Sequence, residues 1–453
     1  MKKILTIILL QTFFCTVGAF ATDSKDYVDF GFWKKFNDEI LVSNIQKSVE
    51  NNVDLKIAVL KVKESEKIVK MSLAQELPSI DFNGLAGKIF SSSDLLRGYR
   101  NYSIRSYTQT RFLLPFEVNY EIDIWGKNHL RTKSRKVTQK ILQQDEKASY
   151  IILTTSIACD YYNLIRTDEL LKLENENYEL TSSLLDLIEK REKIGLSTLD
   201  DVLETKAKLI QINSNINELN ARKQIIENQI AYLMGEKFAP EIERNGFEDT
   251  VEISTIPQDF KSEIILNRPD VVSAFENITR ANYEARIAKK DLLPSFTITG
   301  TFGWNGYNNL KGIFKNHTGI AQVFVAPNLN IFDGGKKYNF MKLKQLELKE
   351  AQTQYEKAVL ASLQEVNDNL AVLKSENQNY KNSKDIFDIQ NKKLNLKTNN
   401  KNFGLSSIID TILYKQIQLN AKKQFTNDKI NQIISYINLY RCVGGYDFAN
   451  ELL

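Results

Sequence analysis

The chain has 453 residues, and its 60 Lys and Arg nearly balance 56 Asp and Glu, leaving a formal net charge of +4. Its basic residues are scattered rather than clustered, which argues against a nucleic-acid partner. The 7 Pro and 19 Gly are few for this length and are typical of a largely helical protein rather than of several ordinary globular domains.

A secretory leader is predicted at residues 1–21, where two lysines precede an apolar run and Ala19-Phe20-Ala21 supplies a small-residue cleavage signal. Cys15 raises lipid attachment as the alternative, but Phe14 occupies the place where that signal requires a small residue. After the leader, no apolar run approaches the roughly 18 residues that a membrane helix needs. If the chain crosses a membrane, it does so with strands.

The first structural repeat is predicted at residues 22–235. Its long helix is the clearest element, because 68 residues from Lys127 to Ile194 contain neither proline nor glycine and would span about 100 Å as one helix. The other expected elements are, in order, an aromatic-rich entry segment, a helix at 38–75, strands at 79–86 and 112–124, a turn at 195–197 and a returning helix at 197–234.

The second structural repeat, residues 258–453, follows an equatorial loop at 236–257. It repeats the same order at an offset of 209 residues, so that Gly404-Leu405-Ser406 matches Gly195-Leu196-Ser197. Apolar residues at heptad spacing in both long helices predict coiled-coil packing. The expected elements are a helix at 257–290, strands at 295–304 and 321–332, a long helix at 336–403, the turn at 404–406, a helix at 406–443 and a C-terminal tail.

The strand at 112–124 alternates a continuously apolar face with a face that carries Glu117, Glu121 and Asp123. A strand of a soluble sandwich would also alternate. An aromatic-rich apolar face on strands of about ten residues in a secreted chain nevertheless favours a membrane barrel with lipid outside and water inside. We therefore predict that the three acids face an aqueous interior.

Four strands cannot close a barrel, and an open sheet edge in lipid would leave backbone groups without hydrogen bonds. Two chains would give eight strands and a filled barrel, whereas three would give twelve strands and room for an aqueous bore. The predicted fold class is therefore mainly α with a membrane β-barrel portion, which is closed by an oligomer.

Five motifs, each weak alone, occur together in this order: Tyr120-Glu121-Ile122-Asp123-Ile124-Trp125-Gly126, Asn267-Arg268-Pro269-Asp270-Val271, Leu293-Pro294-Ser295, Phe332-Asp333-Gly334-Gly335 and the two Gly-Leu-Ser turns. With them, the chain resembles the outer-membrane efflux protein family of TolC type over essentially its whole mature length. The resemblance implies a homotrimer whose twelve-stranded barrel in outer-membrane lipid continues into a periplasmic α-helical tunnel, with the equatorial loop as a belt. It also implies passive export, driven by an inner-membrane pump that is joined through a periplasmic adaptor protein.

Each hairpin turn is followed by a capping box, Thr198 to Asp201 in one and Ser407 to Asp410 in the other, and capping alone would explain both acids. The resemblance places Asp201, Asp410 and Ile409 at a periplasmic gate, where threefold symmetry turns each acid into a ring that favours cations. It also implies an adaptor-docking tip formed by Gly195, Leu196, Ser197, Gly404, Leu405 and Ser406.

Three alternatives stay open: an exit duct for type I protein secretion, a secreted coiled-coil structural protein without a pore, and a periplasmic hydrolase that uses the acidic strand face. The hydrolase is disfavoured because acids two residues apart on an open strand lack a burial partner that would separate their pKa values. His129 and His317 are the only histidines and stand apart, so no metal site, cofactor or enzymatic activity is expected. Cys159 and Cys442 are expected to be buried thiols rather than a disulfide.

Overall fold

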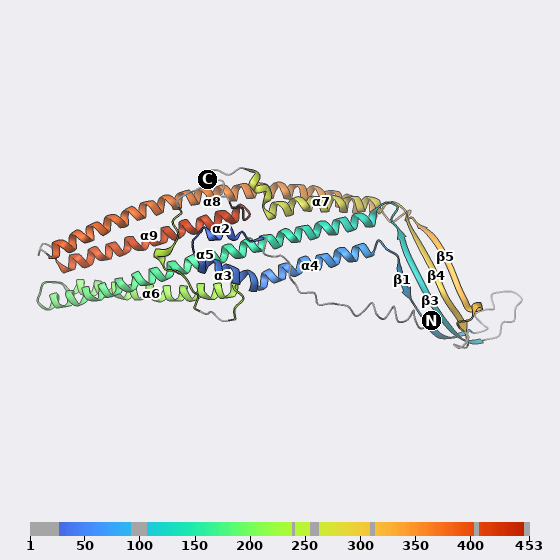
Figure 1. Ribbon diagram of the computed structural model, residues 1–453, viewed down its shortest axis with the longest axis horizontal. Coiled ribbons are helices and arrows are strands. Elements are labelled where there is room, and N and C mark those ends of the chain that lie inside the picture. The colour runs from blue at the N-terminus through green and yellow to red at the C-terminus, as the bar shows by residue number, and fades with distance from the viewer. Residues whose placement is uncertain are drawn as a thin grey trace.

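The computed structural model describes residues 27–91, 107–237, 241–253, 262–308, 313–402 and 407–447. The chain forms an elongated rod, with helices along its length, a β-sheet at one end and the ends of two helical hairpins at the other (Figure 1). The predicted leader and Cys15 lie outside the described residues. Within them, no helix combines the length and the apolarity required to cross a membrane.

Three helices of each half match in length. The long helix of each half runs beside two shorter helices, since α5 packs against α4 and α6, and α8 against α7 and α9. The matching pairs are α4 (Val53–Ala74) and α7 (Pro269–Lys290) with 22 residues each, α5 (Lys127–Lys193) and α8 (Lys336–Asn402) with 67 each, and α6 (Leu199–Leu233) and α9 (Ile408–Cys442) with 35 each.

The helix predicted at 38–75 is in fact two helices, α3 (Glu39–Asn51) and α4, which meet at Asn52. The Asn52 side chain accepts the Leu55 N–H at 2.8 Å and donates to the Leu233 carbonyl oxygen at 2.9 Å. It therefore caps the start of α4 and holds the end of α6 at the same point. The other short helices that the structure describes are α2 (Phe30–Lys34) and the 3₁₀ helices at Phe247–Asp249, Ser262–Asn267 and Asn316–Thr318.

A glycine follows the last helix of each half and packs closely against the segment that leads into the 22-residue helix of the same half. Gly235 and Gly444 have φ values of 70° and 76°, in the left-handed region that favours glycine. A Cβ on Gly235 would lie 2.6 Å from the Asn51 carbonyl oxygen, and one on Gly444 would lie 3.0 Å from the Arg268 Cα. Both halves are thus tied at the waist by the same close backbone approach.

The strands form one antiparallel sheet in the order β1-β3-β4-β5, and β2 also pairs with β3. The strand predicted at 79–86 is broken at residues 83–84, and its two pieces lie end to end along β3, so the sheet is four strands wide. The other predicted strands shift as well: 112–124 becomes 107–122, 295–304 becomes 295–307, and 321–332 becomes 319–328. The strands are β1 (Ser79–Phe82), β2 (Leu85–Ser91), β3 (Tyr107–Ile122), β4 (Ser295–Tyr307) and β5 (Gly319–Asn328).

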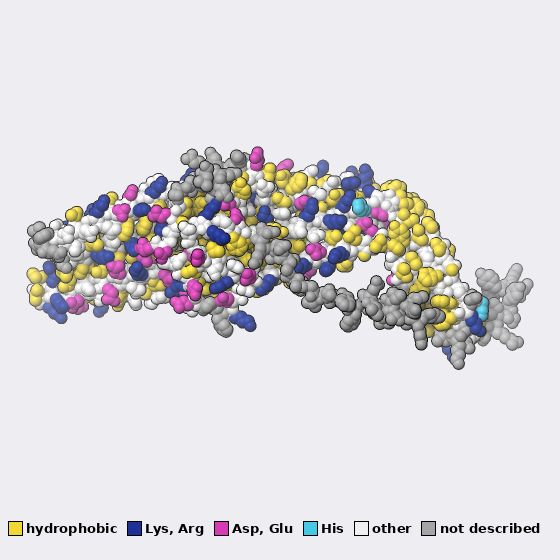
Figure 2. Space-filling view, viewed as in Figure 1, with side chains coloured by type: hydrophobic (Ala, Val, Ile, Leu, Met, Phe, Trp, Pro, Cys, Tyr) yellow, Lys and Arg dark blue, Asp and Glu magenta, His cyan; other side chains and the backbone are white. Residues whose placement is uncertain are grey.

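One face of the sheet is aromatic. Phe82, Phe116 and Phe302 lie opposite one another across three strands, with ring centroids 5.1 and 5.3 Å apart. Their neighbours Asp81 and Glu117 project to the other face, because successive side chains of a strand alternate. In Figure 2 hydrophobic side chains gather over the strands, whereas charged and other polar side chains are spread over the helices.

The apolar core lies at the waist of the rod, where α2, α3, α5 and α9 meet. Phe32 of the entry segment stacks on Tyr440 of α9 with a centroid distance of 3.8 Å, and Trp33 and Phe36 pack beside them. The aromatic entry segment therefore anchors the start of the described chain to the last helix. Two described cysteines, Cys159 (partly buried) and Cys442 (buried), are free thiols, as predicted.

Candidate functional site

Four helices lie side by side, and the ends of both hairpins lie at one end of the rod (Figure 1). Their order is α6, α5, α9, α8, because α5 packs against both α6 and α9, and α9 packs against α8. Figure 1 shows the two hairpins ending together at the end that is farthest from the sheet. The predicted gate and the predicted strand acids therefore lie at opposite ends of the molecule.

Gly195 ends α5 in the left-handed conformation, with φ of 74°. Its N–H donates to the Glu192 carbonyl oxygen at 2.9 Å, and the Leu196 N–H donates to the Arg191 carbonyl oxygen at 2.8 Å. These two bonds satisfy the last carbonyls of the helix and reverse the chain. Leu196 is nevertheless 61% exposed. An uncovered leucine at a rigid turn suits a contact surface rather than a core.

Both capping boxes are present in the structure. In the first, the Thr198 N–H donates to the Asp201 carboxylate at 2.8 Å and the Asp201 N–H donates to the Thr198 hydroxyl at 3.2 Å. In the second, the Ser407 N–H donates to the Asp410 carboxylate at 3.2 Å and the Asp410 N–H donates to the Ser407 hydroxyl at 3.0 Å. Both acids are exposed, whereas Ile409 is partly buried. The predicted docking residues Gly404, Leu405 and Ser406 lie outside the described residues.

The capping bonds keep both acids charged. The pKa of Asp201 lies below its ordinary value of 3.8, because the Thr198 N–H and then the Thr198 hydroxyl donate to the carboxylate. The pKa of Asp410 is lowered in the same way by the Ser407 side chain and then by its N–H. A lowered pKa means that capping stabilises the fold above pH 3.8, and that this contribution is lost as the pH falls through the lowered value.

The three predicted strand acids have different surroundings. Glu117 accepts a hydrogen bond from the Asn83 amide at 3.1 Å. Glu121 forms an ion pair with Lys127 at 3.2 Å. Asp123 follows the end of β3, and its carboxylate accepts the Lys127 N–H at 2.6 Å and the His129 N–H at 2.9 Å. Asp123 therefore lies outside the strand, between β3 and α5, and binds two N–H groups of the first turn of α5, which corrects its predicted place in a strand at 112–124.

Asp81 is an acid that the sequence prediction did not include. Its Cα pairs directly with that of Glu117 across β1 and β3, so the two carboxylates share the polar face of the sheet. The alternation of Asp81 with Ile80 and Phe82 is the signal in the sequence that could have placed it on a polar face. The pairing register was the missing information, because it determines which two residues lie side by side.

Polar side chains join α5 to α9 between the waist and the turns. Polar contacts exchange readily for water, so this part of the hairpins is held less firmly than the apolar waist. Among the described residues, the pair nearest to the turns is Thr181 with Gln416. The pairs are Arg166 with Asn431 (2.9 Å), Glu169 with Lys422 (2.9 Å), Glu174 with Lys423, Glu176 with Lys415 (2.9 Å) and Thr181 with Gln416 (2.7 Å).

In the described ranges, no three His, Cys, Asp or Glu side chains are grouped so that they could hold a metal ion.

The family model for outer membrane efflux proteins matches residues 44–236 and 261–445, which is most of the chain. The chain belongs to the outer membrane efflux protein family. It is an efflux channel of the outer membrane, the exit duct of a tripartite export system, and it extends into the periplasm.

Individual proteins that are similar to this chain are also efflux components. The channel is 25% identical over 417 residues to the solvent efflux pump outer membrane protein SrpC of Pseudomonas putida, a match that covers 90% of this chain and 86% of that protein. It is 21% identical over 367 residues to the cation efflux system protein CusC of Escherichia coli O157:H7, with 81% and 77% covered. The solved CmeC outer membrane channel of Campylobacter jejuni matches with a TM-score of 0.83 at 21% identity, over 96% of this chain and 93% of that one. The predicted fold class, a helical tunnel with a barrel portion, is confirmed.

Proposed function

We propose that three copies of the channel close into a ring, in which four strand positions from each copy build a twelve-stranded barrel. The observation that carries this proposal is that the sheet has two unpaired edges. Among the described strands, β5 pairs with β4 alone, and β1 and β2 pair with β3 alone. Unpaired backbone groups are costly in lipid. Pairing β5 of one copy with the β1 and β2 edge of the next is a head-to-tail contact, which generates a closed ring.

The helical layer has two matching edges, α6 and α8. Leu203 and Ile210 on α6 are 56% and 62% exposed, and Ile389 and Leu396 on α8 are 51% and 63% exposed. Each pair is seven residues apart, which is the spacing of a coiled-coil seam. Leu203 and Leu396 are separated from the turns of their own hairpins by similar numbers of residues, and so are Ile210 and Ile389. Each of these pairs therefore lies at a similar distance from the end of the rod. These faces support a contact between α6 of one copy and α8 of the next.

A cysteine pair tests this contact. Ile210→Cys combined with Ile389→Cys is expected to give covalent trimers on oxidation, because seam residues at one height bring Cβ atoms within disulfide reach. Denaturing gels without reductant provide the measurement. Ile210→Cys combined with Asp388→Cys is the control, since position 388 points about 100° away from position 389 on the same helix. Equal cross-linking of both pairs, or of neither, would refute the seam.

The turns support docking and gating roles for the residues predicted there. The exposed turn at Gly195, Leu196 and Ser197 suits the periplasmic adaptor, and we assign the same role to residues 404–406. Asp201, Asp410 and Ile409 would form the constriction, and the polar contacts between α5 and α9 would let the hairpins separate there. Glu117 and Glu121 would line the bore near the barrel.

The duct conducts passively what the inner-membrane pump delivers, and we assign it no catalytic step. Its relatives are named for solvent efflux and for cation efflux, so one fold serves chemically different cargo.

Planar-bilayer conductance of the purified trimer tests the function. The wild type is expected to form discrete conducting units that prefer cations. Asp410→Ala removes a ring of three carboxylates and should lower the cation-to-anion permeability ratio by about threefold. Asp388→Ala, an exposed acid of α8 away from the turn, should leave the ratio unchanged. Absence of any conducting unit would refute the channel, whereas unchanged selectivity in Asp410→Ala would refute only the gate.

The pH dependence of selectivity follows from the lowered pKa values of Asp201 and Asp410. Both carboxylates stay ionised from pH 7 down to pH 5, because their pKa values lie below 3.8. Reversal potentials are therefore expected to be constant over that interval and to lose cation preference only below about pH 4. A loss of preference that starts between pH 7 and pH 5 would show that other groups control it.

A further inference from the structure

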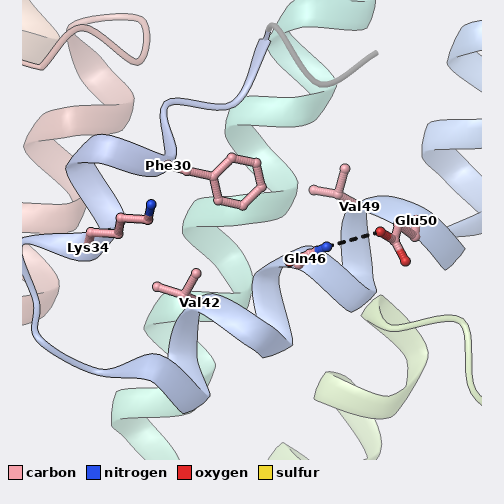
Figure 3. A pocket seen from close by; sticks show the side chains of 6 residues that line it. All are labelled: Phe30, Lys34, Val42, Gln46, Val49 and Glu50. Carbon is pink, nitrogen blue, oxygen red and sulfur yellow. Dashed lines mark hydrogen bonds between the residues drawn. The ribbon is translucent and has the colours of Figure 1, made fainter. Parts of the chain in front are cut away.

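An open groove lies at the waist, between α2 and α3 (Figure 3). Its volume is about 310 Å³, and its lining is mainly apolar, from Phe30, Val42 and Val49. Polar side chains stand around these three: the amine of Lys34, and Gln46, whose amide donates to Glu50 at 3.3 Å. Such a lining suits a short peptide that has large apolar side chains and one acid.

The described end of the chain contacts the end of α2, one of the two helices that line this groove. Asp447 forms an ion pair with Lys35 at 2.5 Å, and Lys35 is the neighbour of Lys34 in sequence. After Asp447 the sequence continues Phe-Ala-Asn-Glu-Leu-Leu, residues 448–453. Six residues span up to about 20 Å when extended, which is enough to cross from Lys35 to α3.

The composition of residues 448–453 fits the groove. Phe448, Leu452 and Leu453 supply large apolar side chains, and Glu451 supplies a carboxylate. Among the described residues, Lys34 has no ion-pair partner, and so it is available to Glu451. The other nearby candidate, the predicted mature start at residues 22–26, reads Thr-Asp-Ser-Lys-Asp and has no large apolar side chain. Both segments could offer a carboxylate to Lys34, but only the later one has large apolar side chains for the apolar lining.

We infer that residues 448–453 occupy this groove, with leucine side chains against Phe30, Val42 and Val49 and Glu451 beside Lys34. The segment would then extend the contact with α2 that the Asp447–Lys35 ion pair begins. It would cover the outer side of the aromatic core at the waist. This placement is independent of the channel function.

Disulfide trapping in the full-length trimer tests the placement. Val42→Cys with Leu452→Cys is expected to oxidise at least about tenfold faster than Lys47→Cys with Leu452→Cys, because docking raises the local concentration of the two thiols. Lys47 is exposed on the far side of α3 and serves as the control. The native Cys159 and Cys442 should not interfere, because burial raises the pKa of each thiol to about 12. Loss of maleimide labelling provides the readout.

Equal rates for the two pairs would overturn the inference. Covalent bonds between chains instead of within one chain would also overturn it, since they would make a second copy the occupant. Thermal unfolding gives a second measurement: deleting residues 448–453 and the substitution Val49→Asp should each lower the Tm by about 3 °C. Together they should lower it little further, because both remove the same contact. Fully additive shifts would contradict docking in this groove.

Discussion

Gly303→Ala is expected to prevent the channel from assembling into its membrane-inserted trimer. An alanine Cβ at this position would lie 2.1 Å from the Leu114 carbonyl oxygen and 2.9 Å from the Pro115 Cα. These are backbone atoms of β3, which pairs with β4 along most of its length, so they cannot move aside without breaking the sheet. We expect the yield of trimer extracted from outer membranes to fall at least about tenfold on unheated gels.

Gly87→Ala is the matched control, since Gly87 also lies in a strand, β2, but a Cβ there would meet no atom within 4 Å. It should leave the trimer yield unchanged. Normal assembly of Gly303→Ala would show that β3 and β4 are farther apart at this level than the structure places them. Loss of assembly in both variants would indicate that any added methyl group in these strands is harmful, and the argument from close approach would fail.

Arg268→Ala is expected to lower the free energy of unfolding by about 2 kcal/mol, because it removes a buried cation that joins three helices and takes the donor away from the buried Cys442 carbonyl oxygen, whereas its half-exposed carboxylate partners regain water. The Arg268 guanidinium binds the Asp270 carboxylate at 2.8 and 3.0 Å and the Glu365 carboxylate at 2.7 Å, and it donates to the Cys442 carbonyl oxygen at 2.5 Å. One side chain thus connects α7, α8 and α9. Denaturant unfolding of the detergent-solubilised trimer measures the loss.

Arg280→Ala gives the comparison for Arg268. Arg280 lies in the same helix and bonds within it, to Asn277 and Glu284. Such a local, partly exposed pair is worth less than about 1 kcal/mol. Equal destabilisation by the two substitutions would mean that the connection between helices contributes nothing beyond an ordinary surface pair.

The long helices and the turns could be predicted from sequence because their signals are local. An uninterrupted run without proline or glycine fixes α5, and Gly195 ends it within two residues of the predicted place. The capping boxes at Thr198 and Ser407 were predicted for the same reason, since a hydroxyl and an acid three residues later form them without help from the rest of the chain.

Most of what the sequence did not predict depends on contacts between distant segments, whereas the place of Asp123 depends on the start of the helix that follows it. The break at Asn52 has no proline or glycine to mark it, and it depends on a bond to Leu233, which is 181 residues away. Asp123 continues the alternation of β3, but its carboxylate binds two N–H groups of the first turn of α5. The pairing of Asp81 with Glu117 requires a strand register that alternation alone does not specify.

Equal helix lengths in the two halves restrict how this protein can change. Because 22, 67 and 35 residues recur in both, all six hairpins of a threefold ring would end in one plane across the axis. Inserting one heptad into each helix of the α5–α6 hairpin alone would push three tips about 10 Å beyond the other three. The hairpin ends would then lie at two levels, and the three longer hairpins would have no neighbouring helices to pack against at their ends. A longer or shorter tunnel therefore requires matched insertions or deletions in both hairpins at once.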